Sequence, residues 1–262
     1  MRIKQFRFIS GLFFIILGAA LFSCATYKAP LKIHNGLSQD ELAYYNDSFK
    51  EMREDLWDRA GNLYRDEQAQ NFKQADLRFT DGQLVIRTKT GSFSKGGLSS
   101  RFFLRGDFDI QLDCRMDFKL GSLDMDQVFS FVVVDKTLKP GKMSFVSMGF
   151  ALAGGGVRGT LFSHCVLNGR RKKGLMQQIE NFKGSLRIFR NGQKISTLYK
   201  NEGAGEWNRM NTFRLTDNDM LIEFQLRNFF VKRTLIVANH SISATFEGFK
   251  VNAAREILEE EI

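Results

Sequence analysis

The chain has few prolines, cysteines, histidines and tryptophans, and each of these shortages excludes something. Two prolines in 262 residues leave no proline-rich linker between domains. The three cysteines and three histidines are scattered along the chain and show no spacing that would form a zinc site. Two tryptophans are also few for a protein that stacks sugar rings on exposed aromatic side chains. By contrast, 26 phenylalanines are enough to fill a thick apolar core.

Strand patterns fill most of the chain. The clearest covers residues 106–118, where apolar residues occupy the even positions and polar residues the odd positions without a break. A period of two is typical of a strand with one buried and one polar face. Asp81-Gly82 and Asn191-Gly192 each separate two alternating runs and predict tight β-hairpins. Since no helices alternate with the strands, we expect an all-β fold, a two-sheet antiparallel β-sandwich or jelly roll.

A helix is expected before the sandwich. Ser38 to Glu41 form a capping box, and apolar residues then recur at spacings of three and four, which predicts an amphipathic helix over residues 38–60 packed on the domain. The β-sandwich domain is expected over residues 61–252. Its last strand changes parity at Gly248, which indicates a β-bulge. Residues 253–262 are expected to form a short helix or a frayed tail.

The N-terminus is typical of an exported protein. Three basic residues precede an apolar run that ends at Ser23-Cys24, and this arrangement resembles the lipobox of bacterial lipoprotein signal peptides. The resemblance implies removal of residues 1–23, acylation of Cys24 with palmitate or similar chains, and a tether over residues 24–37. An uncleaved anchor or a plain signal peptide is the alternative. Removing the segment takes away three positive charges and no acids, so the net charge falls from +9 to about +6 (9 − 3).

The lipobox resemblance also implies a location. We expect a lipid-anchored protein of the bacterial cell envelope, in the outer membrane if the organism has one, because Ala25 rather than Asp follows Cys24. Nucleic acid is then not an expected partner. Acylation of Cys24 leaves Cys114 and Cys165, which either form a disulfide in an oxidising compartment or stay as buried free thiols.

The sandwich resembles a known family. Residues 99–109, with the sequence Ser-Ser-Arg-Phe-Phe-Leu-Arg-Gly-Asp-Phe-Asp, look like a strand pair of concanavalin A-like lectin/glucanase domains, and residues 244–251 are similar to their closing strand. The resemblance covers residues 57–252. It implies a two-sheet jelly roll that often binds carbohydrate and is sometimes hydrolytic.

The polar face of residues 106–118 carries aspartates at alternating positions. Alternate residues of a strand lie about 6.6 Å apart, within the separation of the two carboxylates in inverting glycosidases. Glucanases of the resembling family carry alternating Glu and Asp on such a strand, whereas this one has no Glu, and Gln111 cannot act as an acid or a nucleophile. We therefore interpret the face as a solvated sheet surface whose acids are offset by Arg115 and neighbouring lysines, or at most as a binding face without catalysis. The candidate ligand-binding residues are Asp109, Gln111, Asp113, Arg115 and Trp207.

Three further motifs give weaker indications of a binding site. Residues 154–159 match G-x-G-x-x-G, but a strand rather than a helix follows, which excludes a nucleotide fold. The basic run 170–173 predicts a solvated hairpin tip, or a contact with an anionic membrane surface or an acidic polymer. Asp124 and Asp126, with Asp135 nearby, form either a plain acidic turn or a calcium site.

These patterns lead us to expect a lipid-anchored envelope protein without a cofactor, whose sandwich binds a glycan or another envelope component and is not an enzyme. One alternative is a glycoside hydrolase or polysaccharide lyase that uses Asp109 and Asp113. The other is a structural lipoprotein that contacts a partner through residues 38–60.

Overall fold

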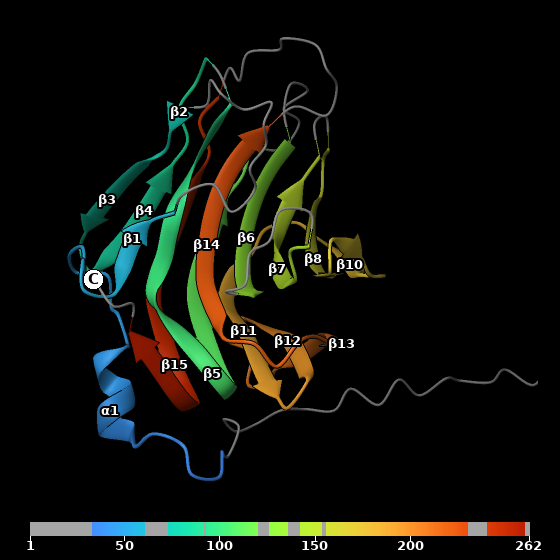
Figure 1. Ribbon diagram of the computed structural model, residues 1–262. Helices are drawn as coiled ribbons and strands as arrows, with labels where there is room; N and C mark the ends of the chain where they lie inside the picture. The colour runs from blue at the N-terminus through green and yellow to red at the C-terminus, as the bar shows by residue number, and fades with distance from the viewer. Residues whose placement is uncertain are drawn as a thin grey trace, which may run out of the picture.

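The structure is a computed structural model, and most of its described residues lie in β-strands, nearly all of them paired antiparallel (Figure 1). This confirms the two-sheet antiparallel β-sandwich expected from the sequence. The expected signal segment and Cys24 lie outside the described residues. No helix in the described ranges is long and apolar enough to cross a membrane. These ranges are 33–60, 73–91, 93–119, 126–135, 142–153, 156–229 and 240–259.

The elements follow one another as one short helix and fifteen strands. In chain order they are α1 (Gln39–Tyr44), β1 (Trp57–Arg59), β2 (Lys73–Gln74), β3 (Asp76–Thr80), β4 (Gln83–Arg87), β5 (Ser94–Asp117), β6 (Asp126–Asp135), β7 (Phe145–Leu152), β8 (Gly159–Leu167), β9 (Arg170–Arg171), β10 (Leu175–Ile179), β11 (Lys183–Asn191), β12 (Lys194–Asn201), β13 (Asn208–Arg214), β14 (Met220–Phe229) and β15 (Ser243–Glu259).

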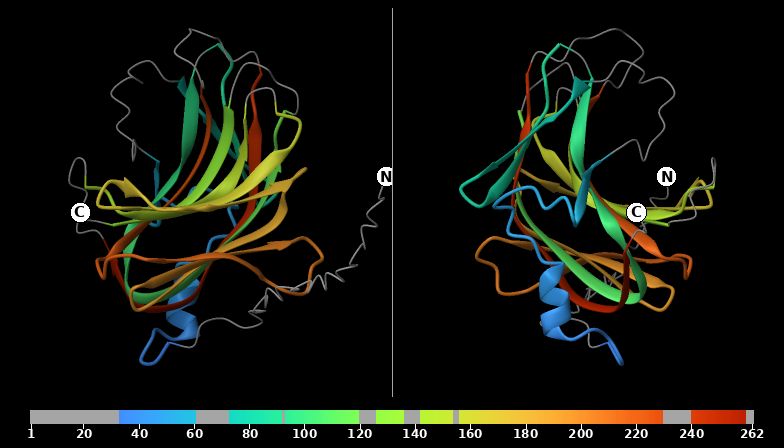
Figure 2. Two further views of the ribbon diagram at one scale, coloured as in Figure 1. Left: turned by 90° about the vertical axis from the view of Figure 1, so that its right-hand side faces the viewer. Right: turned by 60° about the vertical axis from the view of Figure 1, so that its left-hand side comes forward.

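Two curved sheets are stacked face to face and share strand β5 (Figures 1 and 2). In the first sheet the order is β10-β8-β7-β6-β14-β5, with β1 on the free edge of β5. In the second sheet the order is β13-β12-β11-β5-β15-β4-β3. Apart from the short pair β2–β5, every pairing described is antiparallel.

Strand β5 belongs to both sheets because it bends at Gly106. Residues 94–104 pair with β14, and residues 108–115 pair with β11. The resemblance implied a pair of strands over residues 99–109, whereas the structure has one continuous strand there. Gly106 adopts a φ of 71°, a left-handed conformation that glycine reaches without steric cost, so the chain changes direction and pairing continues.

The core lies between the two sheets and is dominated by aromatic side chains. Phe224 of β14 contacts Phe246 of β15 with ring centroids 5.0 Å apart, and Phe129 of β6 approaches Phe246 to 5.2 Å. Trp57 of β1 reaches Phe249 of β15 at 5.1 Å. Aromatic pairs of this kind stabilise a core by about 0.5–1.5 kcal/mol each beyond the area they bury. The phenylalanine-rich composition therefore serves the interior of the sandwich.

The predicted turns are present. Asp81-Gly82 joins β3 to β4 and both residues have positive φ, 51° and 69°, as the expected hairpin turn requires. A tight hairpin also joins β11 to β12, but its turn lies one residue later than predicted, at Gly192 and Gln193, because Asn191 still pairs with Lys194. Of the predicted pair only Gly192 has a positive φ, 56°. The pairing of β15 with β5 shifts register between Phe246 and Gly248, which is the predicted bulge. Cys114 and Cys165, whose state was open, are both buried free thiols.

The helix expected over 38–60 is much shorter. Its capping box forms as predicted, but α1 ends at Tyr44. Beyond it Phe49 has a φ of 53°, outside the right-handed helical region, and the segment ends in strand β1. Every second member of the three-and-four series, Leu42, Phe49 and Leu56, is at most 1% exposed, so the spacing does mark buried residues, but it does not mark a helix.

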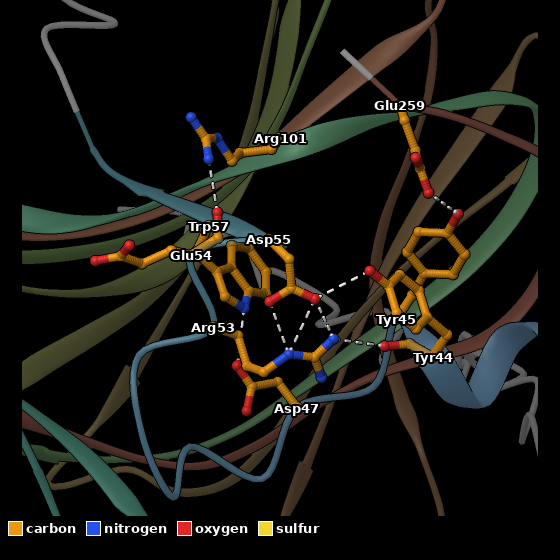
Figure 3. A network of polar contacts seen from close by, with 9 residues as sticks. All are labelled: Tyr44, Tyr45, Asp47, Arg53, Glu54, Asp55, Trp57, Arg101 and Glu259. Atoms are coloured by element: carbon orange, nitrogen blue, oxygen red, sulfur yellow. Dashed lines mark hydrogen bonds and ion pairs between the residues drawn. The ribbon is translucent and has the colours of Figure 1, made fainter. Parts of the chain in front are cut away.

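Contacts with the sandwich replace the helix after α1, and Figure 3 shows some of the polar contacts of this segment, among them those to Arg101 and Glu259. The backbone of Asp47 exchanges two hydrogen bonds with Phe249 of β15, of 3.0 and 2.8 Å. The Asp47 carboxylate, 7% exposed, accepts a hydrogen bond of 2.8 Å from the Trp57 indole nitrogen. The Tyr45 hydroxyl donates to Glu259 at 3.2 Å. Tertiary pairing thus overrides local helix propensity.

The C-terminus also differs from expectation. Residues 253–262 were expected as a helix or a frayed tail, but β15 continues to Glu259. Ala253, Ala254 and the residues up to Glu259 pair with residues 109–102 of β5. The edge of the long strand is available to them, and pairing satisfies backbone groups that a frayed tail would leave to water.

Candidate functional site

The aspartate face singled out from the sequence lies on the outer side of the second sheet. Asp109 is 0% exposed, and its carboxylate is held by Arg187 of β11 in a two-pronged ion pair, with Nε donating to Oδ1 at 2.7 Å. Asn252 of β15 donates to the same oxygen at 3.2 Å. The Asp109 carboxylate of β5 is therefore bound to side chains of the two neighbouring strands, β11 and β15.

The other residues of this face are also engaged within the sheet. Asp113 accepts hydrogen bonds from Gln111 at 2.7 Å and from Ser185 at 2.6 Å, and Arg115 is exposed beside Asp117 at 3.5 Å. The structure thus brings four of the five candidates onto one face of β5.

Trp207 packs beside this face and is only 8% exposed. Its neighbours are Phe189 and Leu198, and the Arg187 guanidinium lies 5.4 Å from its ring. A ring that is covered in this way offers little surface for stacking on a sugar. The five candidates remain a prediction as ligand-binding residues.

The outer face of the first sheet carries a different set of polar residues. Strand β14 turns Ile222, Phe224 and Leu226 into the core, so Glu223 and Gln225 point to the opposite face. Strand pairing places Glu223 in a row of directly opposed residues, here called the Glu223 row. In spatial order it consists of Asp58, Ser99, Glu223, Val132, Ser147 and His164.

Glu223 is the unusual member of the row. It is 2% exposed, and burial raises the pKa of its carboxyl to about 8, although the positive charges of Lys95 and Arg227 act in the opposite direction. Within the described part of the chain its side chain accepts no hydrogen bond. The carboxyl is therefore protonated at neutral pH and can donate its proton, as the general acid of a hydrolase does.

Ser147 and His164 continue the row with unused polar atoms. The Ser147 hydroxyl and His164 Nδ1 are buried and have no hydrogen-bond partner among the described residues. The imidazole lies between the rings of Phe145 and Phe162, at 5.6 and 5.5 Å. Burial, then Arg171 and Arg227, lower the pKa of His164 to about 4, so the ring is neutral. Buried polar groups without partners are rare, and a bound ligand is one reason for them.

Asp58 stands at the other end of the row. It is exposed and lies 3.3 Å from the Arg101 guanidinium, which places a positive charge beside its carboxylate. Ser99 separates it from Glu223, so the two residues are two strand spacings apart, or about 9.5 Å between backbones. Both side chains point to the same face.

No metal centre accompanies these residues. In the described ranges no three His, Cys, Asp or Glu side chains lie together in a way that could hold a metal ion. Of the weighed calcium ligands, Asp124 lies outside the described residues. Asp126 and Asp135 occupy opposite ends of β6, and Asp135 accepts hydrogen bonds from the side chains of Thr216 and Asn218, both at 2.9 Å.

Comparisons with known proteins place the fold. No family model and no curated protein matches the sequence. Among solved structures, a β-1,3-1,4-glucanase (lichenase) from a mouse hindgut metagenome matches with a TM-score of 0.57 at 10% identity, over 79% of this chain and 97% of that one. The β-glucanase of Bacillus licheniformis matches at 0.55 and 12% identity, over 84% and 99%. LamAcat of Zobellia galactanivorans matches at 0.55 and 9%, over 79% and 96%.

These likenesses correct our expectation about activity. We expected a sandwich that binds without catalysis and is not an enzyme. The solved structures that share its fold include lichenase, β-glucanase and a family 16 endo-glucanase from Bacteroides ovatus, and this favours the hydrolase alternative. At 7–12% identity the likeness itself establishes the concanavalin A-like sandwich fold.

Proposed function

We propose that the chain is a glycoside hydrolase that cleaves a polysaccharide lying across the Glu223 row, with Glu223 as the general acid. The observation that carries the proposal is a buried carboxyl, its pKa raised to about 8 by burial, on the outer face of a sandwich whose structural neighbours include glucanases. The alternative pair, Asp109 and Asp113, is less suited, because Arg187 holds the Asp109 carboxylate in a buried ion pair.

The reaction follows from the two carboxyl groups of the row. Glu223 gives its proton to the glycosidic oxygen as the bond from that oxygen to the anomeric carbon breaks. A water molecule attacks the same carbon, and Asp58 accepts the proton that this water loses. Two strand spacings leave room for the sugar and the water, as in inverting enzymes, so we expect inversion at the anomeric carbon. Solvent then returns a proton to Glu223 and removes one from Asp58.

The test is hydrolysis of lichenan and laminarin by wild type and variants, measured as released reducing ends. Glu223→Gln keeps the shape of the side chain but cannot donate the proton, and we expect a loss of at least about 100-fold in kcat. Asp58→Asn should lose a similar amount. Glu247→Gln, at an exposed glutamate of β15, is the matched control and should retain the wild-type rate. Asp113→Asn tests the alternative pair, and a large loss of kcat in that variant would favour the alternative. Full activity in Glu223→Gln would overturn the assignment.

We also propose that Cys24 carries a lipid anchor that holds the hydrolase on the bacterial envelope. Support comes from the order of basic residues, apolar run, Ser23 and Cys24 at the N-terminus. Growth with a labelled fatty acid should label the full chain, and Cys24→Ser should abolish the label and move the protein into the soluble fraction. Unlabelled wild-type protein would contradict the anchor.

A further inference from the structure

A cavity of about 390 Å³ lies at the β8 end of the Glu223 row. Three consecutive cations, Arg171, Lys172 and Lys173, line it together with His164. Arg171 pairs with Val166, two residues along β8 from His164, so it lies on the same face as the row. The cavity is therefore continuous with the face on which the polysaccharide is proposed to lie.

The guanidinium groups of Arg171 and Arg227 lie close enough to His164 to act on it electrostatically. The pKa of His164 is lowered first by burial and then by the charges of Arg171 and Arg227, so both guanidinium groups act on the imidazole. His164 lines the cavity, but its Nδ1 atom and the hydroxyl of Ser147 are buried, and Ser147 is not part of the lining. An anion in the cavity would therefore be held by the cations of its wall.

Apolar surface completes the wall of the cavity. Leu175 is 41% exposed, Met176 is 68% exposed, and both line the cavity with Phe162. A sugar ring presents apolar C–H faces together with hydroxyl groups, and a charged sugar adds a carboxylate or a sulfate. The combination of apolar side chains and three cations matches the apolar faces and the negative charge of such a sugar.

We propose that this cavity is a binding subsite for a sugar residue that carries a carboxylate or a sulfate, so that the polysaccharide on the Glu223 row is anionic. From Glu223 to His164 is three strand spacings, about 14 Å, a distance that a few linked sugar residues cover. The position of the cut rests on the proposed function, whereas binding of the charged sugar is measurable without any hydrolysis.

The test uses the Glu223→Gln variant of the full chain, in which cleavage does not disturb binding. Calorimetry compares an alginate oligosaccharide, which carries carboxylates, a dextran sulfate oligosaccharide and a neutral laminarin oligosaccharide of equal length. We expect tighter binding of one or both anionic ligands, weakened by added salt. Adding Arg171→Gln and Lys173→Gln should lower that affinity at least tenfold and leave laminarin unchanged. Arg78→Gln, an exposed arginine of the β3–β4 hairpin, is the matched control and should change neither.

Three results would overturn the subsite. One is equal affinity for charged and neutral ligands, and another is unchanged affinity after the two substitutions. The third is binding of phosphatidylglycerol vesicles with no binding of either charged oligosaccharide, since the basic loop would then be a membrane contact. If the wild-type protein binds the charged sugar but hydrolyses no polysaccharide, the proposed function is wrong and the subsite is still supported.

Discussion

At the scale of single residues, the molecule places two buried acids in opposite electrostatic settings. Asp109 has its charge balanced by Arg187 and stays inside the second sheet as a structural ion. Glu223 has no such partner among the described residues, and burial therefore favours its protonated form. The same chemical group joins strands in one position and is available for proton transfer in the other.

Glu223 makes stability depend on pH. Its folded pKa of about 8 exceeds the ordinary value of 4.5, so between these values the folded state holds a proton that the unfolded state has lost. The free energy of unfolding should therefore fall as pH rises from about 5 to 8, by up to about 1.4 kcal/mol per pH unit from this group. Urea unfolding at several pH values measures the slope, and Glu223→Gln should flatten it. An unchanged slope in the variant would show that Glu223 is ionised in the folded protein.

Glu223 also sets an upper pH limit for catalysis. A general acid works only while it holds its proton, so activity on the substrate should fall as pH rises through about 8. A profile of kcat/KM against pH measures the pH at which activity falls. In a Glu223→Asp variant that retains residual activity, this pH should shift, whereas in Glu247→Gln it should stay at the wild-type value.

Arg187 offers a test of the buried ion pair. Arg187→Ala leaves the fully buried Asp109 carboxylate without its main partner and should lower the free energy of unfolding by about 3–5 kcal/mol. Lys183→Ala removes one partner of an exposed pair with Glu202 and should cost less than about 1 kcal/mol. Chemical denaturation of both variants compares them. Equal losses would mean that the Asp109 pair is no stronger than a surface contact.

At the scale of elements, the sequence predicts strands well and helix length poorly. Period-two alternation specifies which residues of β5 and β14 face the core, because a slip of one residue would expose them all. Apolar spacing after Ser38 was ambiguous, because Phe49 and Leu56 are buried through contacts with distant strands that no local pattern records. The continuation of β15 was missed for the same reason, since its partner lies over a hundred residues earlier.

The site was harder to predict than the fold. Asp109 and Asp113 drew attention because several acids alternate on one strand, yet such a row is typical of a sheet surface whose charges are paired. Glu223 is the single acid of β14, where it shares the polar face with Gln225 and Arg227, and this lone acid was the only local signal. Its neighbours in the row come from five other strands, so their proximity depends on register that the sequence alone does not reveal.

The bend in β5 can be tested through its glycine. Gly106→Ala forces an L-residue into a φ of 71° and brings a Cβ atom to 2.7 Å from the Arg255 side chain, which must move. We expect a loss of about 1–2 kcal/mol in the free energy of unfolding, measured by denaturation. Gly205→Ala has open space around the new atom and no positive φ, and it should be nearly neutral. A neutral Gly106→Ala would show that the bend does not depend on glycine.

At the scale of the whole molecule, the two sheets are held together by packing and by β5, without a disulfide between the described cysteines. Burial raises the pKa of Cys165 to about 11 and that of Cys114 well above its usual value, so neither is a reactive thiolate. Iodoacetamide should leave both thiols of the native protein unmodified and should alkylate both after unfolding without a reductant. A failure to alkylate the unfolded chain would reveal a disulfide.

The place of β15 in the chain has a consequence for biosynthesis. It is made over a hundred residues after β5, yet it covers residues 102–117 of that strand, which both sheets share. Until residues 243–259 emerge, β5 presents a bare edge able to pair with another chain. A nascent chain of this protein is therefore exposed to misassembly while the residues between β5 and β15 are made, and a molecule that loses residues 243–259 keeps that hazard permanently.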